Sequence, residues 1–297
     1  MGSDASRPFR FGVVLTGGEP AGWAERSRRA EALGYDVVLA PDHLGLPAPL
    51  PSLGAAAAVT ARARVGTFVL NTAFYDPGLL AREVATIDGV SGGRFELGLG
   101  AGYVRSEFDA LGIPFGTASE RLDRLERFLE RLDGFLADPD LRPRPDQRPV
   151  PIFLGGNGNR MLRIAVQHAG IVGFSGTTVD ADGRLTLIGG DDFADRVGYA
   201  RAAAGARADE IEWNALVQVV AITDDREEAG ERLRESWAPH LAIDEFLAAP
   251  TVLVGTVDEM AADLEERRQR LGLTYVSVLE PAMEDFALVV ERLNNKR

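Results

Sequence analysis

The chain has 297 residues, 45% of them hydrophobic, and its 32 basic and 45 acidic residues leave a formal net charge of −13. A chain of this length and apolar content can bury a large core, and its acidic balance argues against nucleic acid or an anionic membrane as the main partner, because both require basic patches. The absence of cysteine excludes disulfides and thiolate chemistry, and the three histidines, His43, His168 and His240, are too few for us to expect a metal site.

Neither a signal peptide nor a membrane span is visible in the pattern of apolar residues. The first twelve residues, MGSDASRPFRFG, lack an apolar core, and no run approaches the roughly 20 apolar residues of a membrane helix. We therefore expect a cytoplasmic protein with no membrane partner.

Short apolar runs typical of strands alternate with helical patterns along the whole chain. We predict strands at residues 9–15, 35–40, 64–70, 95–99, 151–154, 171–174, 212–222 and 273–279. Predicted helices separate nearly all of them; the clearest, 120–136, has apolar residues at steps of three and four, and another begins at Asp76-Pro77, a capping residue followed by proline.

Eight strands in strict alternation with helices favour a (β/α)₈ TIM barrel, formed as one domain over residues 1–297. We expect insertions at the C-terminal face: a short segment at 104–112 and a longer loop or small hairpin at 178–190. A doubly wound open sheet is the alternative, but no G-x-G-x-x-G follows the first strand.

Small residues follow six of the predicted strands, and in a barrel all of these loops open on one face. The relevant stretches are Thr16-Gly17-Gly18, Pro41-Asp42-His43, Asn71-Thr72, Gly98 to Gly102, Gly155 to Arg160 and Ser175-Gly176-Thr177. Each glycine cluster alone is better explained by a tight turn, but together they suggest a large, flat ligand lying against the backbone. Gly155–Asn159 leads into a helix N-terminus, which suits a phosphate, and Arg160 is placed to assist.

His43, directly after the second predicted strand, is the main candidate for proton transfer or for orienting a cofactor ring. A histidine that is merely hydrogen-bonded at a loop start is the alternative. Arg105 and Glu107 are placed either to face the same opening or to be exposed charges. No nucleophile elbow, Walker loop or H-E-x-x-H is present, so redox chemistry by an organic cofactor fits better than hydrolysis.

Four stretches together resemble the bacterial luciferase-like superfamily, in particular its actinobacterial branch of coenzyme F420-dependent oxidoreductases. They are GYDVVLAPDH, VGTFVLNTAFYDPGLLAREVATIDGVSGGRFELGLGAGYVRSEFDALG, PIFLGGNGNRMLRIA and VLVGTVDEMAADL. The resemblance implies a TIM barrel with an insertion and a flavin or deazaflavin at its C-terminal opening. It also implies a non-proline cis peptide near Phe68–Val69, behind the cofactor ring.

The resemblance also assigns roles to particular residues. Phosphate contacts map to Gly155, Gly156 and the loop Ser175-Gly176-Thr177, while Asp42-His43 matches the pair beside the ring in F420-dependent sugar-phosphate dehydrogenases. Ala101 and Pro47 stand where those dehydrogenases have a glutamate and a tryptophan, which argues against oxidation of glucose 6-phosphate.

We therefore expect F420-dependent hydride transfer to or from a small organic substrate. The alternatives are an FMN-dependent two-component monooxygenase using reduced flavin and O₂, and a non-catalytic barrel that binds a cofactor. A homodimer is typical of the family. The expected catalytic residues are His43 and Asp42. The expected cofactor-binding residues are Phe68, Val69, Asn71, Gly98, Gly100, Gly102, Gly155, Gly156, Asn157, Ser175, Gly176 and Thr177.

Overall fold

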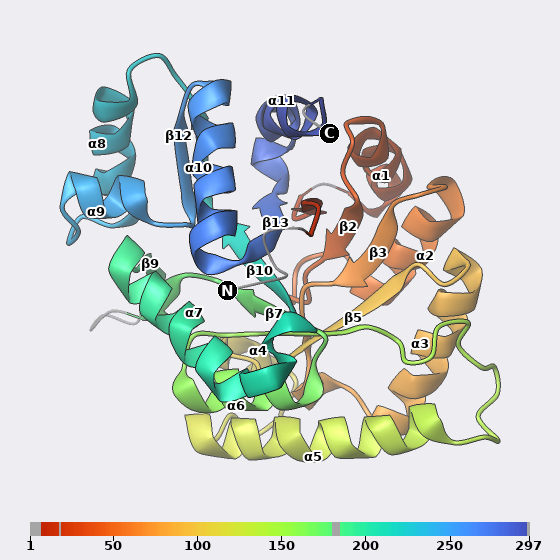
Figure 1. Ribbon diagram of the computed structural model, residues 1–297. Coiled ribbons are helices and arrows are strands. Elements are labelled where there is room, and N and C mark those ends of the chain that lie inside the picture. Colours follow the sequence, from red (N-terminus) through yellow and green to blue (C-terminus); the bar gives the residue numbers. More distant parts are fainter. Residues whose placement is uncertain (1–6, 18, 180–184, 296–297) are drawn as a thin grey trace.

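A parallel barrel ringed by helices forms the centre of the structure, a computed structural model that describes residues 7–17, 19–179 and 185–295 (Figure 1). Its strands are β1 (Arg10–Val14), β2 (Val37–Ala40), β3 (Arg64–Thr67) with β4 (Leu70–Asn71), β5 (Phe95–Gly100), β6 (Ile152–Gly155), β7 (Ile171–Phe174), β10 (Glu212–Val217) and β13 (Leu273–Leu279). The hydrogen-bonded order is β3-β2-β1-β13-β10-β7-β6-β5-β4, and pairing of β3 with β5 closes the ring. The predicted TIM barrel is confirmed.

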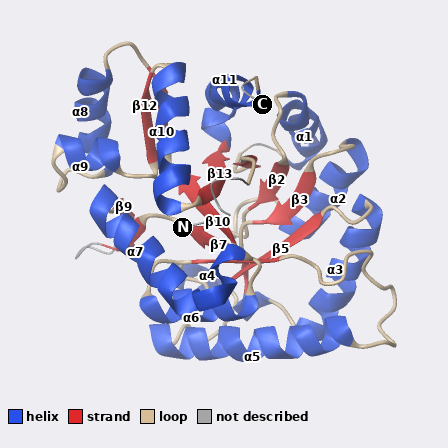
Figure 2. Ribbon diagram, in the orientation of Figure 1, coloured by secondary structure: helices blue, strands red, loops and turns tan. Residues whose placement is uncertain are grey.

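Helices cover the outside of the barrel (Figure 2). They are α1 (Trp23–Ala32), α2 (Pro49–Val59), α3 (Pro77–Ser91), α5 (Ala118–Ala137), α6 (Asn159–His168), α7 (Gly190–Ala204), α10 (Val257–Leu271) and α11 (Met283–Asn294). Local sequence sets where several begin: the Asp76 carboxylate accepts hydrogen bonds from the first amides of α3, and a capping box joins Thr117 and Glu120 at α5. No helix in the described ranges combines the length and apolar character that a membrane crossing requires.

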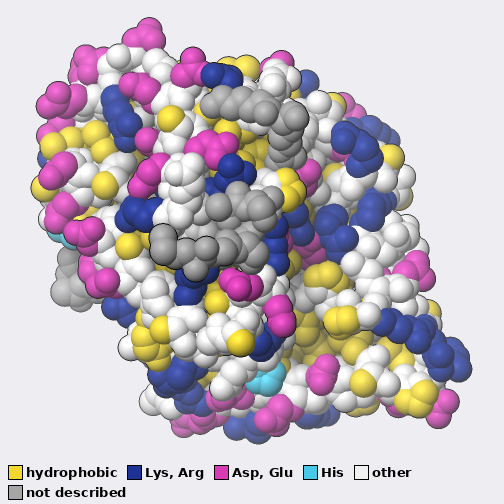
Figure 3. Space-filling view, viewed as in Figure 1, with side chains coloured by type: hydrophobic (Ala, Val, Ile, Leu, Met, Phe, Trp, Pro, Cys, Tyr) yellow, Lys and Arg dark blue, Asp and Glu magenta, His cyan; other side chains and the backbone are white. Residues whose placement is uncertain are grey.

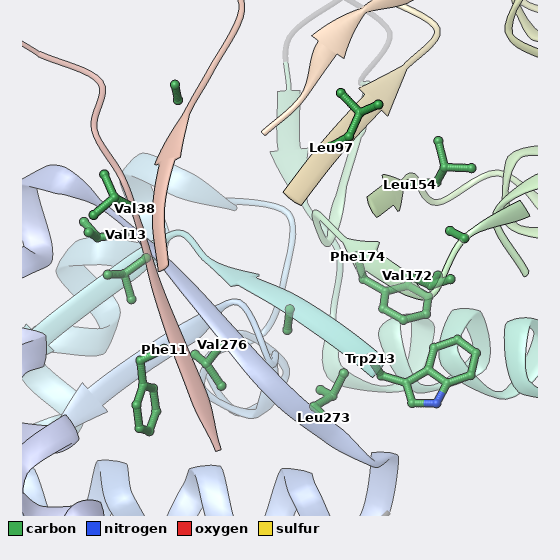
Figure 4. Close-up of a cluster of buried hydrophobic side chains, with 14 of the residues drawn as sticks. Phe11, Val13, Val38, Leu97, Leu154, Val172, Phe174, Trp213, Leu273 and Val276 are labelled. Carbon is green, nitrogen blue, oxygen red and sulfur yellow. The ribbon is translucent and has the colours of Figure 1, made fainter. Parts of the chain in front are cut away.

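Alternate side chains of each strand point outward into the layer between barrel and helices. Figure 4 shows Phe11 and Val13 of β1 in this layer, and Phe174 of β7 beside Trp213 of β10, whose rings stack 6.2 Å apart. The intervening residues face the barrel interior, where bulky side chains lie opposite glycines. A Cβ on Gly173, for example, would lie 2.2 Å from the ring of Phe153. Both faces of the strands are therefore buried: one packs against the helices and the other fills the barrel interior.

The seventh strand differs from its prediction as one run over 212–222. After β10 the chain leaves the barrel as β11 (Val219–Ile222), which pairs in parallel with β12 (Val252–Gly255), a strand that the sequence analysis missed. With α8 (Arg226–Trp237) and α9 (Ile243–Ala248), these strands bury a hydrophobic cluster of their own. Acidic side chains gather over this lobe, at the upper left of Figure 3.

The third, fourth and sixth barrel strands also carry additions. The predicted strand 64–70 is interrupted between β3 and β4. After β7, the segment left open as a loop or hairpin contains an antiparallel hairpin of β8 (Thr177–Val179) and β9 (Leu185–Leu187). The short segment after β5 contains α4 (Arg105–Ala110). These additions lie at the C-terminal ends of the strands, as predicted for insertions.

Candidate functional site

A cavity of about 550 Å³ opens at the C-terminal ends of the barrel strands. Its volume lies within the range of small-molecule and cofactor sites, roughly 300–1,000 Å³. It is lined by Val14, Thr16, Pro41, Asp42, His43, Leu46, Phe68, Val69, Leu70, Asn71, Gly100, Ala101, Gly102, Tyr103, Val104, Glu107, Leu122, Phe153, Gly155, Gly156, Asn157, Met161, Gly173, Phe174, Ser175, Thr177, Thr178, Leu185, Leu216, Gln218 and Leu279. The loops that the sequence placed on one face thus converge on one cavity.

A bulge between β3 and β4 shapes one wall of this cavity. Gly66 pairs with Glu96 and Leu70 with Leu99, so four residue steps on one strand oppose three on the other. The Thr67 hydroxyl bridges the interruption: it accepts from the Gly98 N–H and donates to the Gly98 carbonyl, both at 2.8 Å. The expected cis peptide bond is present at Phe68–Val69, and both residues line the cavity.

The glycines of β5 and its loop accommodate this bulge. A Cβ on Gly98 would lie 1.9 Å from the Thr67 carbonyl oxygen, and one on Gly100 would lie 2.8 Å from a methyl group of Val69. Gly102 has a φ of +74°, and a Cβ there would meet the Asn71 side chain at 2.4 Å. Close approach of two protein segments therefore explains these three glycines.

His43 is held at the cavity by a carboxylate. Its Nδ1 lies 2.9 Å from Glu107 Oε1, which also accepts the Leu44 N–H at 3.2 Å. The Glu107 side chain is 11% exposed and that of His43 is 35% exposed. On the other edge of the imidazole, Nε2 lies 3.4 Å from the Tyr103 hydroxyl. An ionised carboxylate only accepts hydrogen bonds, so this contact places a proton on Nδ1, and Nε2 is the acceptor of the corresponding neutral tautomer.

Asp42 connects the cavity wall that contains His43 to the bulge between β3 and β4. Its Oδ2 accepts the Asn71 N–H at 3.0 Å, and its carboxylate is hydrogen-bonded to the Tyr75 hydroxyl. Burial raises the pKa of Asp42, although the hydrogen bonds from Asn71 and Tyr75 oppose the shift. Burial, followed by the charge of Asp42, raises the pKa of Tyr75, which keeps the phenol a donor.

The opposite wall is polar. Asn157 Nδ2 donates to Ser175 Oγ at 2.8 Å and to the Thr177 carbonyl at 2.6 Å, and the Gln218 amide donates to the Ser175 carbonyl at 3.0 Å. Asn157 Oδ1 is buried without a hydrogen-bond partner among the described residues. A buried acceptor left open beside a cavity is suited to a ligand hydroxyl or N–H.

The structure separates the expected cofactor residues into two groups. Phe68, Val69, Asn71, Gly100, Gly102, Gly155, Gly156, Asn157, Ser175 and Thr177 line the cavity, as do Asp42 and His43. Gly98 and Gly176 are not among its lining residues. Gly98 packs on Thr67, and a Cβ on Gly176, whose φ is +61°, would lie 2.1 Å from the Thr251 methyl group.

Gly156 and Arg160 make contacts other than those that the sequence predicted. The Gly156 N–H, which was expected to contact a phosphate, donates instead to the Gly173 carbonyl at 3.0 Å. The first turn of α6, which begins at Asn159, remains the source of N–H groups for such a contact. Arg160 points to α5 instead of the cavity: it bonds Ser119 Oγ at 2.9 Å, Asp123 at 2.5 Å and Glu126. Its proposed assistance to a phosphate has no support in this geometry.

Glu107 and Gln218 are the site residues that the sequence analysis did not select. The sequence left open whether Glu107 faces the cavity or is an exposed charge. In the structure Glu107 is buried in α4 and contacts His43. Gln218 lies between β10 and β11, within a segment that reads as one continuous strand. Among the residues that the structure describes, no three His, Asp or Glu side chains gather as a metal site.

The residues of this cavity fit a flat cofactor with a phosphorylated side chain. Apolar side chains, among them Val14, Phe68, Val69, Leu216 and Leu279, offer surface for a ring system. The open Asn157 oxygen, the Ser175 and Thr177 hydroxyls and the first turn of α6 offer donors and acceptors for a polar chain and a phosphate.

Several proteins with similar sequences or folds are named as dehydrogenases, reductases or monooxygenases. An F420-dependent glucose-6-phosphate dehydrogenase of Microbacterium testaceum is 30% identical over 259 residues, covering 78% of this chain and 74% of the relative. An FMNH₂-dependent dimethylsulfone monooxygenase of Pseudomonas putida is 33% identical over 103 residues, 30% of this chain and 28% of the relative. The structure of a coenzyme F420-dependent tetrahydromethanopterin reductase from Methanopyrus kandleri superposes with a TM-score of 0.75 at 21% identity, covering 98% and 99% of the two chains.

The family assignment rests on nearly the whole chain. Residues 6–291 match the family model described as luciferase-like monooxygenase, a span that includes every barrel strand and all the cavity-lining residues. This chain belongs to the luciferase-like monooxygenase family.

Proposed function

We propose that this protein is an F420-dependent oxidoreductase that moves a hydride between the deazaflavin and a small, uncharged organic substrate. The observation that carries the proposal is the placement of His43: its imidazole lines a largely apolar cavity, and a buried carboxylate holds the opposite edge. This arrangement provides one proton-transfer group at a surface suited to a flat ring.

The cofactor would be held by two walls. Phe68 and Val69 would support its ring, and the Asn157–Ser175–Thr177 cluster with the start of α6 would bind its polar chain and phosphate. The bound deazaflavin would supply the hydride acceptor or donor. The protein would contribute orientation, exclusion of water and a proton path.

His43 Nε2 is the proposed site of proton transfer. An alcohol that loses a hydride from carbon must also lose its O–H proton, and neutral Nε2 is an acceptor at the cavity wall. Glu107 favours this tautomer and stabilises the imidazolium that forms, and the reverse transfer uses the same proton. The Tyr103 hydroxyl, 3.4 Å from Nε2, would yield its place to the substrate hydroxyl.

The charges of the cavity favour an uncharged substrate. Among its described lining residues the acidic side chains are Asp42 and Glu107, and none is lysine or arginine. A phosphorylated sugar placed beside His43 would meet the Asp42 and Glu107 carboxylates without a compensating cation, which costs binding free energy. Ala101 and Pro47, which stand where the resemblance places a glutamate and a tryptophan of the sugar-phosphate dehydrogenases, argue separately against oxidation of glucose 6-phosphate.

Cofactor titration is the first test. We expect purified protein to bind F420 tightly and FMN weakly, and His43→Gln to retain F420 binding while reducing turnover of secondary alcohols or ketones by about a hundredfold. Tight FMN binding without F420 binding would refute the proposal, and O₂ consumption with reduced FMN would then establish the monooxygenase alternative. F420 binding with no turnover across neutral substrates would favour a non-catalytic barrel.

A further inference from the structure

We propose that a second cavity, outside the barrel, binds a small organic anion: a phosphate or carboxylate attached to an aromatic or similarly apolar group. This cavity, called here the α3–α5 groove, has a volume of about 450 Å³ and lies between the start of α3 and the middle of α5. It is lined by Thr72, Ala73, Phe74, Tyr75, Asp76, Pro77, Arg124, Arg127, Phe128 and Arg131. The inference is independent of the proposed function.

The charge of the groove is opposite to that of the chain. Three guanidinium groups of α5 line it with a single carboxylate, in a protein of net charge −13. That carboxylate, Asp76, is already used: its Oδ1 accepts the N–H groups of Gly78 and Leu79 at 2.9 and 3.1 Å, and its Oδ2 lies 3.8 Å from Arg131. The groove therefore retains an excess of positive charge.

Two of the arginines keep donors available. Arg124 gives one hydrogen bond, from Nη2 to the Pro114 carbonyl at 3.1 Å, while its Nη1 is buried without a partner among the described residues. Arg127 has no hydrogen bond or ion pair within the described part of the chain, although α5 also carries acidic residues. Those at 123 and 126 bond Arg160 instead. Guanidinium donors left open in a concave site match the oxygens of a phosphate or carboxylate.

The remaining walls of the groove indicate which chemical group is attached to the anion. Phe74 and Phe128 line the groove and provide apolar surface, and Tyr75 is also among its lining residues. A bare inorganic ion would leave this surface unused, whereas a ring or short hydrocarbon attached to the anion would bury it. Arginine also packs favourably on aromatic rings, so the two features suit one ligand.

The groove and the barrel cavity share a wall. Residues 68–71 line the barrel cavity and residues 72–75 line the groove, and the Tyr75 hydroxyl bonds Asp42 on the barrel side. A ligand in the groove would thus contact the segment that positions Asp42. The two sites nonetheless use different side chains, so variants separate them.

The test is isothermal titration of the full-length protein with phenyl phosphate, benzoate and inorganic phosphate at low ionic strength. We expect saturable binding of the two aromatic anions, with inorganic phosphate binding more weakly. Arg127→Gln should weaken binding by about tenfold, because one charge-assisted contact is lost, and the Arg124→Gln/Arg127→Gln double variant should abolish it. Arg232→Gln, which removes the same charge from an exposed position of α8, should bind as the wild type does.

The outcomes are distinguishable. Absence of saturable binding refutes the proposal, as does equal weakening by Arg127→Gln and Arg232→Gln, which would indicate a long-range charge effect. Binding that survives the double variant but is lost when F420 or FMN fills the barrel cavity would place the anion in that cavity and also refute it. Arg127 is exposed, so its variant should fold even if the Arg124 variant does not.

Discussion

Gly98→Ala tests whether the bulge at Thr67–Leu70 determines the glycines of β5. The added Cβ would lie 1.9 Å from the Thr67 carbonyl oxygen and 3.1 Å from a Val69 methyl group, whereas ordinary contacts begin near 3.4 Å. Because the closest atom belongs to the backbone, no rotamer change relieves the overlap. One of the two strands must move.

The expected cost lies at the upper end of the range for overpacking a core. Such substitutions typically cost about 1–3 kcal/mol, and a backbone clash within a barrel strand should reach about 3 kcal/mol. At roughly 2 °C per kcal/mol in a chain of this size, the melting temperature should fall by about 6 °C. Displacement of Val69 should also weaken binding of the proposed cofactor, F420, because Val69 lines the cavity.

Thermal unfolding followed by circular dichroism, with F420 titration of the same samples, measures both effects. Gly89→Ala is the matched control: Gly89 lies in α3, a Cβ there meets no atom within 4 Å, and helix propensity predicts a gain of about 0.5–1 kcal/mol. If Gly98→Ala melts with the wild type and binds the cofactor equally well, the explanation of the glycine-rich strand is wrong.

Three further variants test the site and the lobe. Glu107→Gln, which keeps the shape but removes the charge beside His43, should lower kcat about tenfold with little change in KM; an unchanged kcat in steady-state assays would remove Glu107 from the mechanism. Asp42→Asn should stabilise the protein at neutral pH: burial raises the pKa of Asp42 in the native state, so its contribution to stability falls as pH rises through that raised value. The gain in melting temperature should shrink on acidification, and a pH-independent difference would contradict the assigned cause. Burial lowers the pKa of Arg267 to about 10, so it is charged at neutral pH, where it donates to the carbonyl of Pro250, before β12, and to that of Val252, the first residue of β12. Arg267→Met should therefore cost about 2–4 kcal/mol in urea unfolding, and a loss under 1 kcal/mol would show that the lobe does not depend on it.

Local sequence was sufficient to predict the barrel, because the patterns that define its strands and helices extend over only a few residues. Strand and helix periods act over a few residues, as does the Asp76-Pro77 start of α3, which the structure has where it was predicted. The split of the seventh strand was not predictable in this way. Val219 to Ile222 continues an apolar run, and only the presence of β12, about thirty residues further on, draws it out of the barrel.

For the candidate site, too, the sequence predicted one part and the tertiary structure determined the other. Composition and spacing predicted which loops meet at the cavity, because the carboxyl ends of parallel strands share one face of a barrel. The partners of each side chain depended on distant segments: Glu107 reaches His43 from a helix 64 residues away, and Arg160 is drawn to α5 by acidic residues.

At the glycine stretch from Gly98 to Gly102, the sequence and the tertiary structure determined different things. The sequence alone determined that backbone must approach closely there, since glycine is the residue that permits it. Only the tertiary structure decided that the approaching group at Gly98, Gly100 and Gly102 is the bulge at 67–71, because a bulge is a property of two paired strands and neither strand's sequence specifies the register between them.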